Sequence, residues 1–421
     1  MAQEYLPAPS NVRLADLMKE HNISQPELAK EIGCSKSTIS RFISGAKGTL
    51  LAVPFYILCG VLMNTGGIAQ KLIDFAKILV GRIPGGLAHT NILGNTLFGS
   101  LSGSSVAASV AIGGVLIPME EKEGYDKKFA AAVNIASAPT GLIIPPSGIL
   151  IIYPVLAGCS VVGMIMSGYI PGLMWALACM VVAYVIAKKN HYPTAGKVPA
   201  SVFFKYFVDA IPSLLLIVII VGGVMSGIFT ATESAAVAVA YTLFLSIVVY
   251  RSIKIKDLPK ILLDACETTA VIMFLIAGSN VMSFVMSFTG LPSAIGNALI
   301  SVSSNKYVIL LIINLVLLVV GCFMDITPAV LIFTPIFLPV VQSFGMDPIH
   351  FGIMMVMNLG IGNITPPVGS ALFSGCSVAD MDMEDMIKPI LPFYAAIFVA
   401  LMLVAYVPWF SMALPTLFGA V

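Results

Sequence analysis

Long apolar stretches, separated by short polar ones, dominate this 421-residue chain from residue 49 to its end. A membrane-crossing helix needs ~20 predominantly apolar residues, and several of the stretches approach or reach that length. Full crossings are predicted at 161–186, 210–229, 234–250, 268–288, 307–322 and 392–418. An amphipathic stretch at 68–83 suits a helix that lies in the membrane interface. The pattern therefore predicts an all-α polytopic membrane protein with roughly eight crossings.

The first 48 residues have a different pattern. Residues 1–10 are proline-rich and are predicted to be disordered, whereas residues 11–46 are polar and predict a short soluble segment of three helices. Ser24 fits a helix cap and Gly33 a helix end. The segment resembles the helix-turn-helix of Cro-like repressors, whose third helix enters the major groove of DNA. The resemblance implies DNA contacts from Gln25, Lys36, Ser37, Thr38 and Arg41. An incidental helical appendage is the alternative, because three helices are few for an independent core.

A motif with two adjacent prolines, GxIxPPxG, occurs at 141–148 and again 221 residues later, at 362–369. The same spacing relates three further pairs: Pro118 and Pro339, Gly124 and Gly345, and Asp126 and Asp347. Each proline lacks an N–H and clashes with the preceding turn, so neither motif can continue an α-helix. The chain therefore predicts two structural repeats, at about 49–190 and 260–421, each with a broken membrane helix. Linking helices are predicted at about 200–250.

An apolar segment precedes each broken helix, at 102–118 and at 323–339. Polar or helix-breaking residues interrupt both segments, so neither is expected to cross the membrane cleanly. A re-entrant hairpin, with its tip buried in protein or facing water, fits this pattern better. Between the linking helices, Glu233 is interpreted as a helix cap or turn residue, not as a proton relay.

Two interrupted helices at matching positions of two halves indicate the binding site of a secondary transporter. Half-helix N-termini offer N–H groups to an anion, whereas carbonyl ends and hydroxyls can coordinate a hard cation such as sodium. Asp325 is the foremost candidate, because a carboxylate within the membrane is costly; ion ligand and helix cap are both open roles. Thr140, Asn358 and Thr365 lie beside the breaks and are interpreted as site-lining, with helix packing as the alternative.

Composition supports the membrane assignment and excludes several functions. Apolar residues make up 58% of the chain and charged residues 10%, too few charges to coat a soluble domain. A net charge of +1 argues against a nucleic-acid surface for the chain as a whole. The seven cysteines have no metal-ligand spacing, and no ATP-binding loop or zinc-protease motif occurs, so neither an enzyme nor direct ATP coupling is predicted. No arginine lies within a predicted crossing, so dipoles, hydroxyls and co-transported cations would have to hold an anionic substrate.

Several motifs in order resemble one family, the large membrane subunit of tripartite ATP-independent periplasmic (TRAP) transporters. The matching segments are LAVPFYIL at 51–58, GSLSGSSVA at 99–107, TGLIIPPS at 140–147, FTATESA at 229–235 and NITPPVG at 363–369. The similarity covers about residues 49–421.

The resemblance implies an elevator-type importer in the bacterial inner membrane, in which hairpins and broken helices form a mobile transport domain. Sodium would flow inward with an organic acid, a dicarboxylate or a sugar acid. The partners would be a periplasmic solute-binding protein and a small membrane subunit, with sodium as the coupling ion and no other cofactor. Ser104, Ser105, Thr140 and Pro145 would line the first ion site. The second would be lined by Asp325, Thr327, Gly362 and Thr365, next to Asn358 and Pro366.

The front of the chain departs from the family pattern. Family members begin with further membrane helices before the segment at 51–58, whereas this sequence has the helix-turn-helix fragment there. Three interpretations follow: a fused or mis-assembled gene, a degraded transporter gene, or a membrane-tethered DNA-binding regulator.

Overall fold

The computed structural model describes residues 52–194, 200–225, 228–290 and 305–420, together with residues 294, 295 and 298. Every regular element in these ranges is a helix. Segments 1–10 and 11–46 lie outside the described residues, and so do the candidate DNA contacts Gln25, Lys36, Ser37, Thr38 and Arg41.

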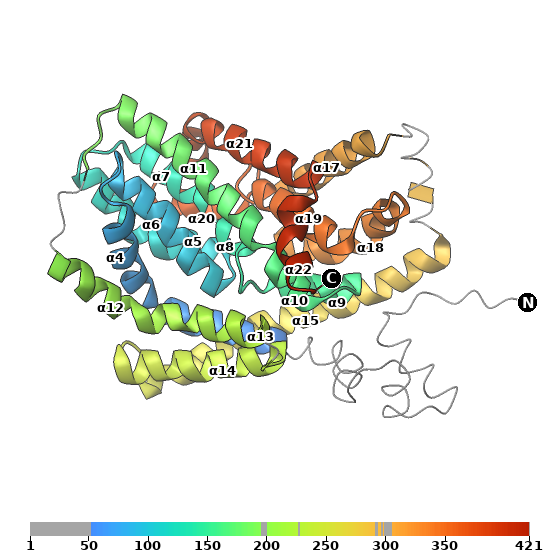
Figure 1. Ribbon diagram of the computed structural model, residues 1–421, viewed down its shortest axis with the longest axis horizontal. Helices are drawn as coiled ribbons and strands as arrows, with labels where there is room; N and C mark the ends of the chain where they lie inside the picture. Colours follow the sequence, from blue (N-terminus) through green and yellow to red (C-terminus); the bar gives the residue numbers. More distant parts are fainter. Residues whose placement is uncertain are drawn as a thin grey trace, which may run out of the picture.

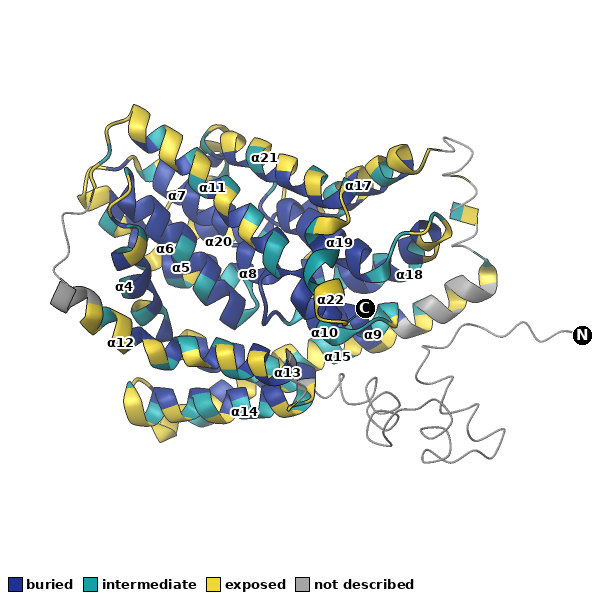
Figure 2. Cartoon of the chain, in the orientation of Figure 1, coloured by how far each residue is buried: buried dark blue, intermediate teal, exposed yellow. Residues whose placement is uncertain are grey.

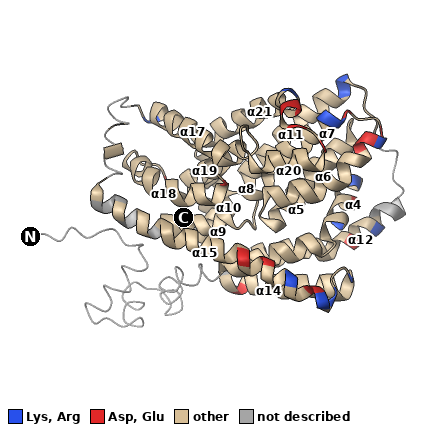
Figure 3. Ribbon diagram, turned by 180° about the vertical axis from the view of Figure 1, so that it is seen from behind, with Lys and Arg blue, Asp and Glu red and all other residues tan. Residues whose placement is uncertain are grey.

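Seven helices of the described part are long and apolar enough to cross a membrane. The helix Ala52–Thr65 and α4 (Ile68–Val80) meet at an angle of 71° and make an eighth crossing if they are counted as one span. Charged residues lie mostly toward helix ends, apart from those along α4, and the long apolar helices are almost free of them in their middles (Figure 3). The prediction of an all-α, multi-pass membrane fold is confirmed.

The first repeat consists of a helical hairpin followed by a broken helix. The hairpin arms are α5 (Gly86–Ser102) and α6 (Ser105–Lys122). The broken helix comprises α7 (Lys127–Ser137), the single turn α8 (Thr140–Ile143) and, after a non-helical break at 144–148, α9 (Ile149–Ala157). Two further helices complete this part of the chain, α10 (Val161–Ser167) and α11 (Tyr169–Lys189).

The second repeat has the same order of elements. Its hairpin arms are α17 (Lys306–Phe323) and α18 (Ile326–Ser343). Its broken helix comprises α19 (Pro348–Gly362), a break at 363–369 and α20 (Ser370–Val378). The chain ends with α21 (Met383–Tyr406) and α22 (Trp409–Leu417). We call 144–148 the first break and 363–369 the second break.

Local conformation repeats along with the sequence. Gly124 and Gly345 both have a left-handed backbone, with φ of 87° and 76°. Asp126 and Asp347 then cap the two broken helices, because each carboxylate accepts a hydrogen bond from a backbone N–H two residues later. The two proline pairs of the breaks have the same peptide geometry. The predicted repeat is thus present in the backbone as well as in the sequence.

The two repeats exchange their half-helices. After the first break, α9 packs against α18 of the second hairpin, and after the second break, α20 packs against α6 of the first. The halves before the breaks form the centre: every residue from Phe129 to Ser137 and from Ile349 to Gly362 is buried. Figure 2 shows this buried interior, with α5, α8 and α19 almost wholly dark blue.

The linking helices lie along one side of the molecule, as Figure 1 shows for α12 and α14. They comprise α12 (Ala200–Ile217), a π-helical turn (Val218–Gly222), α13 (Gly223–Met225), α14 (Ala231–Phe244), a second π-helical turn (Leu245–Val249), a 3-10 turn (Ile255–Asp257) and α15 (Leu258–Thr289). Glu233 forms a capping box with Thr230 at the start of α14, which confirms its interpretation as a cap.

Three features of the helices differ from the sequence-based expectation. The hairpin segments are broken only at their tips, since α6 continues through Pro118 and α18 through Pro335 and Pro339. The last apolar stretch is two helices, because it bends at 407–408. Finally, α4 is more than an interfacial helix: its apolar face packs on α5 and α12, which buries residues such as Leu72 and Ile73.

Candidate functional site

The first hairpin turns at Gly103 and Ser104, which we call the first tip. Gly103 has a φ of 64°, a left-handed conformation that favours glycine, and a Cβ atom there would lie 3.1 Å from the backbone nitrogen of Gly148. Ser104 caps α6, because its hydroxyl accepts a hydrogen bond from the Ala107 N–H at 3.2 Å. The first tip is therefore pressed against the first break, with the N-terminus of α6 directed toward it.

The second hairpin turns at Met324 and Asp325, the second tip. Asp325 occupies the capping position of α18, yet its side chain makes no capping hydrogen bond. Its carboxylate Oδ1 instead accepts a hydrogen bond from the Ser370 hydroxyl at 3.2 Å, across the second break. The backbone N–H groups of Val368 and Gly369 reach back to the Cys322 carbonyl, each at 3.3 Å. Each tip thus lies beside the break of its own repeat.

Glycine pairs allow each hairpin to approach its broken helix closely. A Cβ atom on Gly141 would lie 2.2 Å from the backbone of Gly99, and one on Gly362 would lie 2.5 Å from the backbone of Gly321. Real Cβ atoms essentially never come so close to backbone atoms, so both helix contacts require the absence of a side chain. We call the contacts of Gly141 with Gly99 and of Gly362 with Gly321 the glycine crossings. Gly362 therefore has a packing role that its place in the repeated motif did not reveal.

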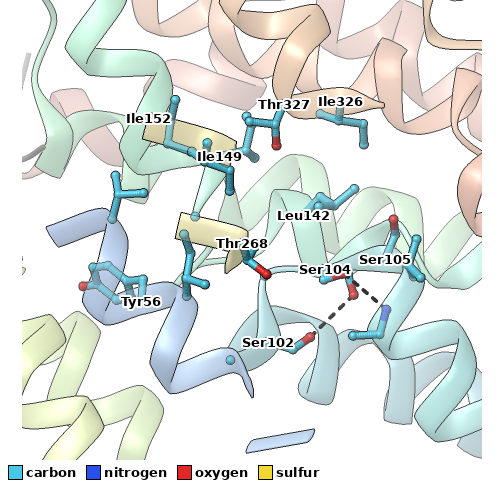
Figure 4. A pocket seen from close by; sticks show the side chains of 18 of the residues that line it. Tyr56, Ser102, Ser104, Ser105, Leu142, Ile149, Ile152, Thr268, Ile326 and Thr327 are labelled. Carbon is cyan, nitrogen blue, oxygen red and sulfur yellow. Dashed lines mark hydrogen bonds between the residues drawn. The ribbon is translucent and has the colours of Figure 1, made fainter. Parts of the chain in front are cut away.

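The two tips face one cavity of about 330 Å³. Its walls come from both tips, the first break, α9, the helix Ala52–Thr65 and α15. Figure 4 shows the hydroxyl groups of Ser102, Ser104, Thr268 and Thr327 around this space. Of the described residues that line it, Asp325 alone is charged. Since carboxylate, hydroxyl and carbonyl oxygens are the ligands of hard cations, the arrangement fits a sodium ion beside either tip.

The ten site residues predicted from the sequence fall into two groups. Four of them line the cavity: Ser104, Ser105, Asp325 and Thr327. The other six do not appear in its wall, and these are Thr140, Pro145, Asn358, Gly362, Thr365 and Pro366. Pro145 and Pro366 lie within the breaks themselves.

Three of the residues outside the cavity wall make internal hydrogen bonds. The hydroxyl of Thr140 donates to the Ser137 carbonyl at 2.7 Å, and that of Thr365 donates to the Ile361 carbonyl at 2.6 Å. The amide of Asn358 donates to the Asn314 side chain at 2.7 Å. These bonds fasten the broken helices, in line with the packing alternative.

Sequence reasoning missed several polar residues at the site. Asn363 and Ser370 connect with Asp325 through hydrogen bonds, and Tyr56 and Thr268 line the cavity. Ser147, in the first break, is fully buried, and its hydroxyl has no hydrogen-bond partner within the described part of the chain. Asn363 and Ser147 stand inside the repeated motif, but their types differ between its two copies, so the repeat gave no reason to select them.

The sequence is similar to those of several known proteins. The family model described as "Tripartite ATP-independent periplasmic transporter, DctM component" matches residues 29–410. A Salmonella typhimurium protein named "Uncharacterized protein YgiK" is 51% identical, over 94% of this chain and 90% of that protein. The C4-dicarboxylate TRAP transporter large permease protein DctM of Pseudomonas aeruginosa is 39% identical, over 90% of this chain and 89% of its own length. The sialic acid TRAP transporter large permease protein SiaM of Vibrio cholerae is 40% identical, over 88% and 87%.

A solved structure has a similar fold. The YdaH transporter of Alcanivorax borkumensis superimposes with a TM-score of 0.61, over 87% of this chain and 85% of that one, at 14% identity. At such low identity the similarity concerns the fold alone. The family match begins at residue 29, inside the segment for which a helix-turn-helix was predicted, and the comparisons give that prediction no support.

Proposed function

Since this chain belongs to the family of DctM large permease components of TRAP transporters, multi-pass proteins of the inner membrane and not enzymes, we propose that it imports an organic acid together with sodium. One observation carries the proposal. Two hairpin tips and the first break meet at a single cavity, lined by hydroxyl groups and by one carboxylate.

The oxygen ligands argue for a cation as the coupling species. Asp325 is exposed to the cavity and lacks a cationic partner among the residues that line it. A sodium ion beside the second tip would neutralise this charge and satisfy the hydroxyl and carbonyl oxygens that surround it. In this proposal sodium is transported along with the acid, and its ligands are oxygen atoms.

With the charge of Asp325 neutralised by sodium, the same cavity also suits an anion. The N-termini of α6 and α18 both open onto it, so their free N–H groups and helix dipoles favour a carboxylate. Related permeases are named for C4-dicarboxylates, sialic acid and 2,3-diketo-L-gulonate, all of them acids. We therefore assign an organic acid as the substrate class.

Transport would occur by movement of the two hairpins and broken helices as one body against the linking helices. The exchange of half-helices between repeats ties these elements together. The linking helices expose apolar side chains such as Phe204, Ile228 and Phe244, which suits contact with lipid and with a small membrane subunit. TRAP large permeases work with such a subunit and with a periplasmic binding protein, and we expect the same two partners here.

Uptake into proteoliposomes tests the proposal. The chain would be reconstituted with its small subunit and binding protein, and labelled succinate, sialic acid and 2,3-diketo-L-gulonate would be offered under an inward sodium gradient. We expect accumulation of one acid, and no accumulation when potassium replaces sodium. Equal uptake in the two salts would overturn sodium coupling. A rise in melting temperature that is specific to sodium, measured on the purified chain, gives a second readout that needs no partner.

The alternative, a membrane-tethered DNA-binding regulator, has no observation in its favour. Its helix-turn-helix residues lie outside the described part, and no comparison supports it.

A further inference from the structure

Four side chains form a hydrogen-bonded chain from one hairpin to the other. The amide of Asn363 donates to the Ser105 hydroxyl at 2.7 Å, although the two residues are 258 positions apart. The Asn363 carbonyl oxygen accepts a hydrogen bond from Ser370, and the Ser370 hydroxyl also lies 3.2 Å from the Asp325 carboxylate. Asn363 is therefore the link between the start of α6, where Ser105 lies, and the second tip.

The number of hydrogens available to these four side chains makes their hydrogen bonding sensitive to the charge of Asp325. A serine hydroxyl has a single hydrogen, yet Ser370 lies within hydrogen-bond distance of two acceptors, Asp325 and Asn363. An ionised carboxylate is the stronger acceptor and attracts that hydrogen. Once a cation neutralises Asp325, the hydrogen is free to turn fully toward the Asn363 carbonyl. The Asn363 side chain is then fixed more firmly, and with it the hydrogen bond to Ser105.

The repeat shows that this amide is not required by the backbone. The residue equivalent to Asn363 in the first motif is Leu142, an apolar side chain in the helical turn α8 directly before the first break. Asn363 is only 1% exposed, and burial of an amide is costly unless its groups are hydrogen-bonded. Its side chain is thus committed to Ser105 and Ser370, one partner from each repeat.

We propose that Asn363 is a positioning residue that couples cation binding at the second tip to the geometry of the first tip. This inference rests on the proposed sodium coupling. Cation binding beside Asp325 releases the Ser370 hydrogen to Asn363, and Asn363 in turn orients Ser105 where the first tip meets the cavity. Binding at one tip therefore favours binding at the other, and by linkage the effect is reciprocal.

The test is a sodium titration of uptake, and of melting temperature on the purified chain. The natural chain is expected to respond cooperatively, with a Hill coefficient above 1. Asn363→Leu, which installs the residue of the first motif, is expected to lower the coefficient to about 1 and to raise the half-saturating sodium concentration at least about fivefold. Asn314→Leu is the control: it also removes a buried amide of the second repeat, but that amide bonds to Leu310 and Asn358. The control is expected to lower stability without changing the Hill coefficient.

A double-mutant cycle in the natural chain gives a reading that does not depend on the folding of Asn363→Leu, and the same cycle in the Asn363→Leu background adds a second reading. Ser105→Ala and Ser370→Ala are expected to be non-additive in sodium half-saturation, by at least about fivefold, because Asn363 is hydrogen-bonded to both serines. In the background of Asn363→Leu the same two changes should become additive. Additive effects in the natural chain, or a Hill coefficient of 1 there, would overturn the inference. Uptake that ignores sodium altogether would instead overturn the proposed function.

Discussion

The two repeats have the same backbone plan but different chemistry at matching positions. Both have a hairpin, an aspartate-capped broken helix and a glycine crossing. At the tips, however, Ser104 is matched by Asp325, so only the second hairpin brings a charge to the cavity. The comparison shows that symmetry is kept where backbones must approach closely, and is abandoned where side chains select a ligand.

Two further pairs of matching positions differ in polarity. In the repeated proline motif, Leu142 is matched by Asn363, whose side chain bonds to both repeats. In the second arm of each hairpin, the buried Glu120 of α6 is matched by the buried Val341 of α18. Four changes, ordered from the largest expected effect to the smallest, would break or sharpen this comparison.

The glycine crossings should be indispensable in both repeats. Gly141→Ala is expected to destabilise the protein by about 3 kcal/mol or more, because the new Cβ would meet backbone that cannot rotate away. Gly362→Ala should behave similarly, though less severely, since its contact is longer. The melting temperature of the purified protein measures both. Gly278→Ala on α15 is the control, because nothing lies within 4 Å of its Cβ position; equal loss in all three would contradict the crossing argument.

The buried carboxylate should be tolerated in the first hairpin only. Glu120 has no exposed surface, and neither of its carboxylate oxygens has a hydrogen-bond partner in the described part of the chain, although Asn91 is a polar neighbour. Val341→Glu would place a second such group among apolar side chains, and should cost about 1–3 kcal/mol in the free energy of unfolding. Glu120→Gln, the control, keeps shape without charge and should change stability by less than about 1 kcal/mol. A Glu120→Gln variant as unstable as Val341→Glu would show that the first hairpin requires the carboxyl group at this position.

The charge at the second tip should matter more for transport than the hydroxyl at the first. Asp325→Asn is expected to raise the half-saturating sodium concentration about tenfold or more, equivalent to about 1.4 kcal/mol, because a charged ligand is lost. Ser104→Ala should have a smaller effect, since the cap it removes is partly replaced by water. Sodium-dependent uptake measures both variants. Asp264→Asn, an exposed aspartate of α15, should leave uptake unchanged; an effect of Ser104→Ala that equals that of Asp325→Asn would remove the asymmetry of the tips.

The smallest effect is expected at an ion pair that joins the first repeat to α21. Lys128 on α7 lies 2.6 Å from Asp385 on α21, but both side chains are about half exposed. Water and salt screen such a pair, so Lys128→Met should cost less than about 1 kcal/mol. The melting temperature at low and high salt checks this, because a screened pair loses its contribution as salt rises. A large loss that persists at high salt would mean that the pair acts through packing.

Much of the fold follows from the sequence because its signals are local. Adjacent prolines end a helix wherever they occur, so both breaks were predictable at 145–146 and 366–367. The apolar stretches predicted crossing helices, and Thr230 with Glu233 predicted a cap. Part of the candidate site was also predictable: the intramembrane charge pointed to Asp325 and the family resemblance to Ser104, Ser105 and Thr327, and all four line the cavity.

Only the tertiary structure decided which distant residues meet. The crossing of Gly141 with Gly99, the exchange of α9 and α20 between the repeats, and the bond from Asn363 to Ser105 each join segments that the sequence pattern treats as independent. The same holds for Thr140 and Asn358, which the pattern placed at the site and the packing placed among internal hydrogen bonds. Periodicity and helix breakers report the conformation of a few neighbouring residues, whereas the composition of a cavity depends on how whole helices pack.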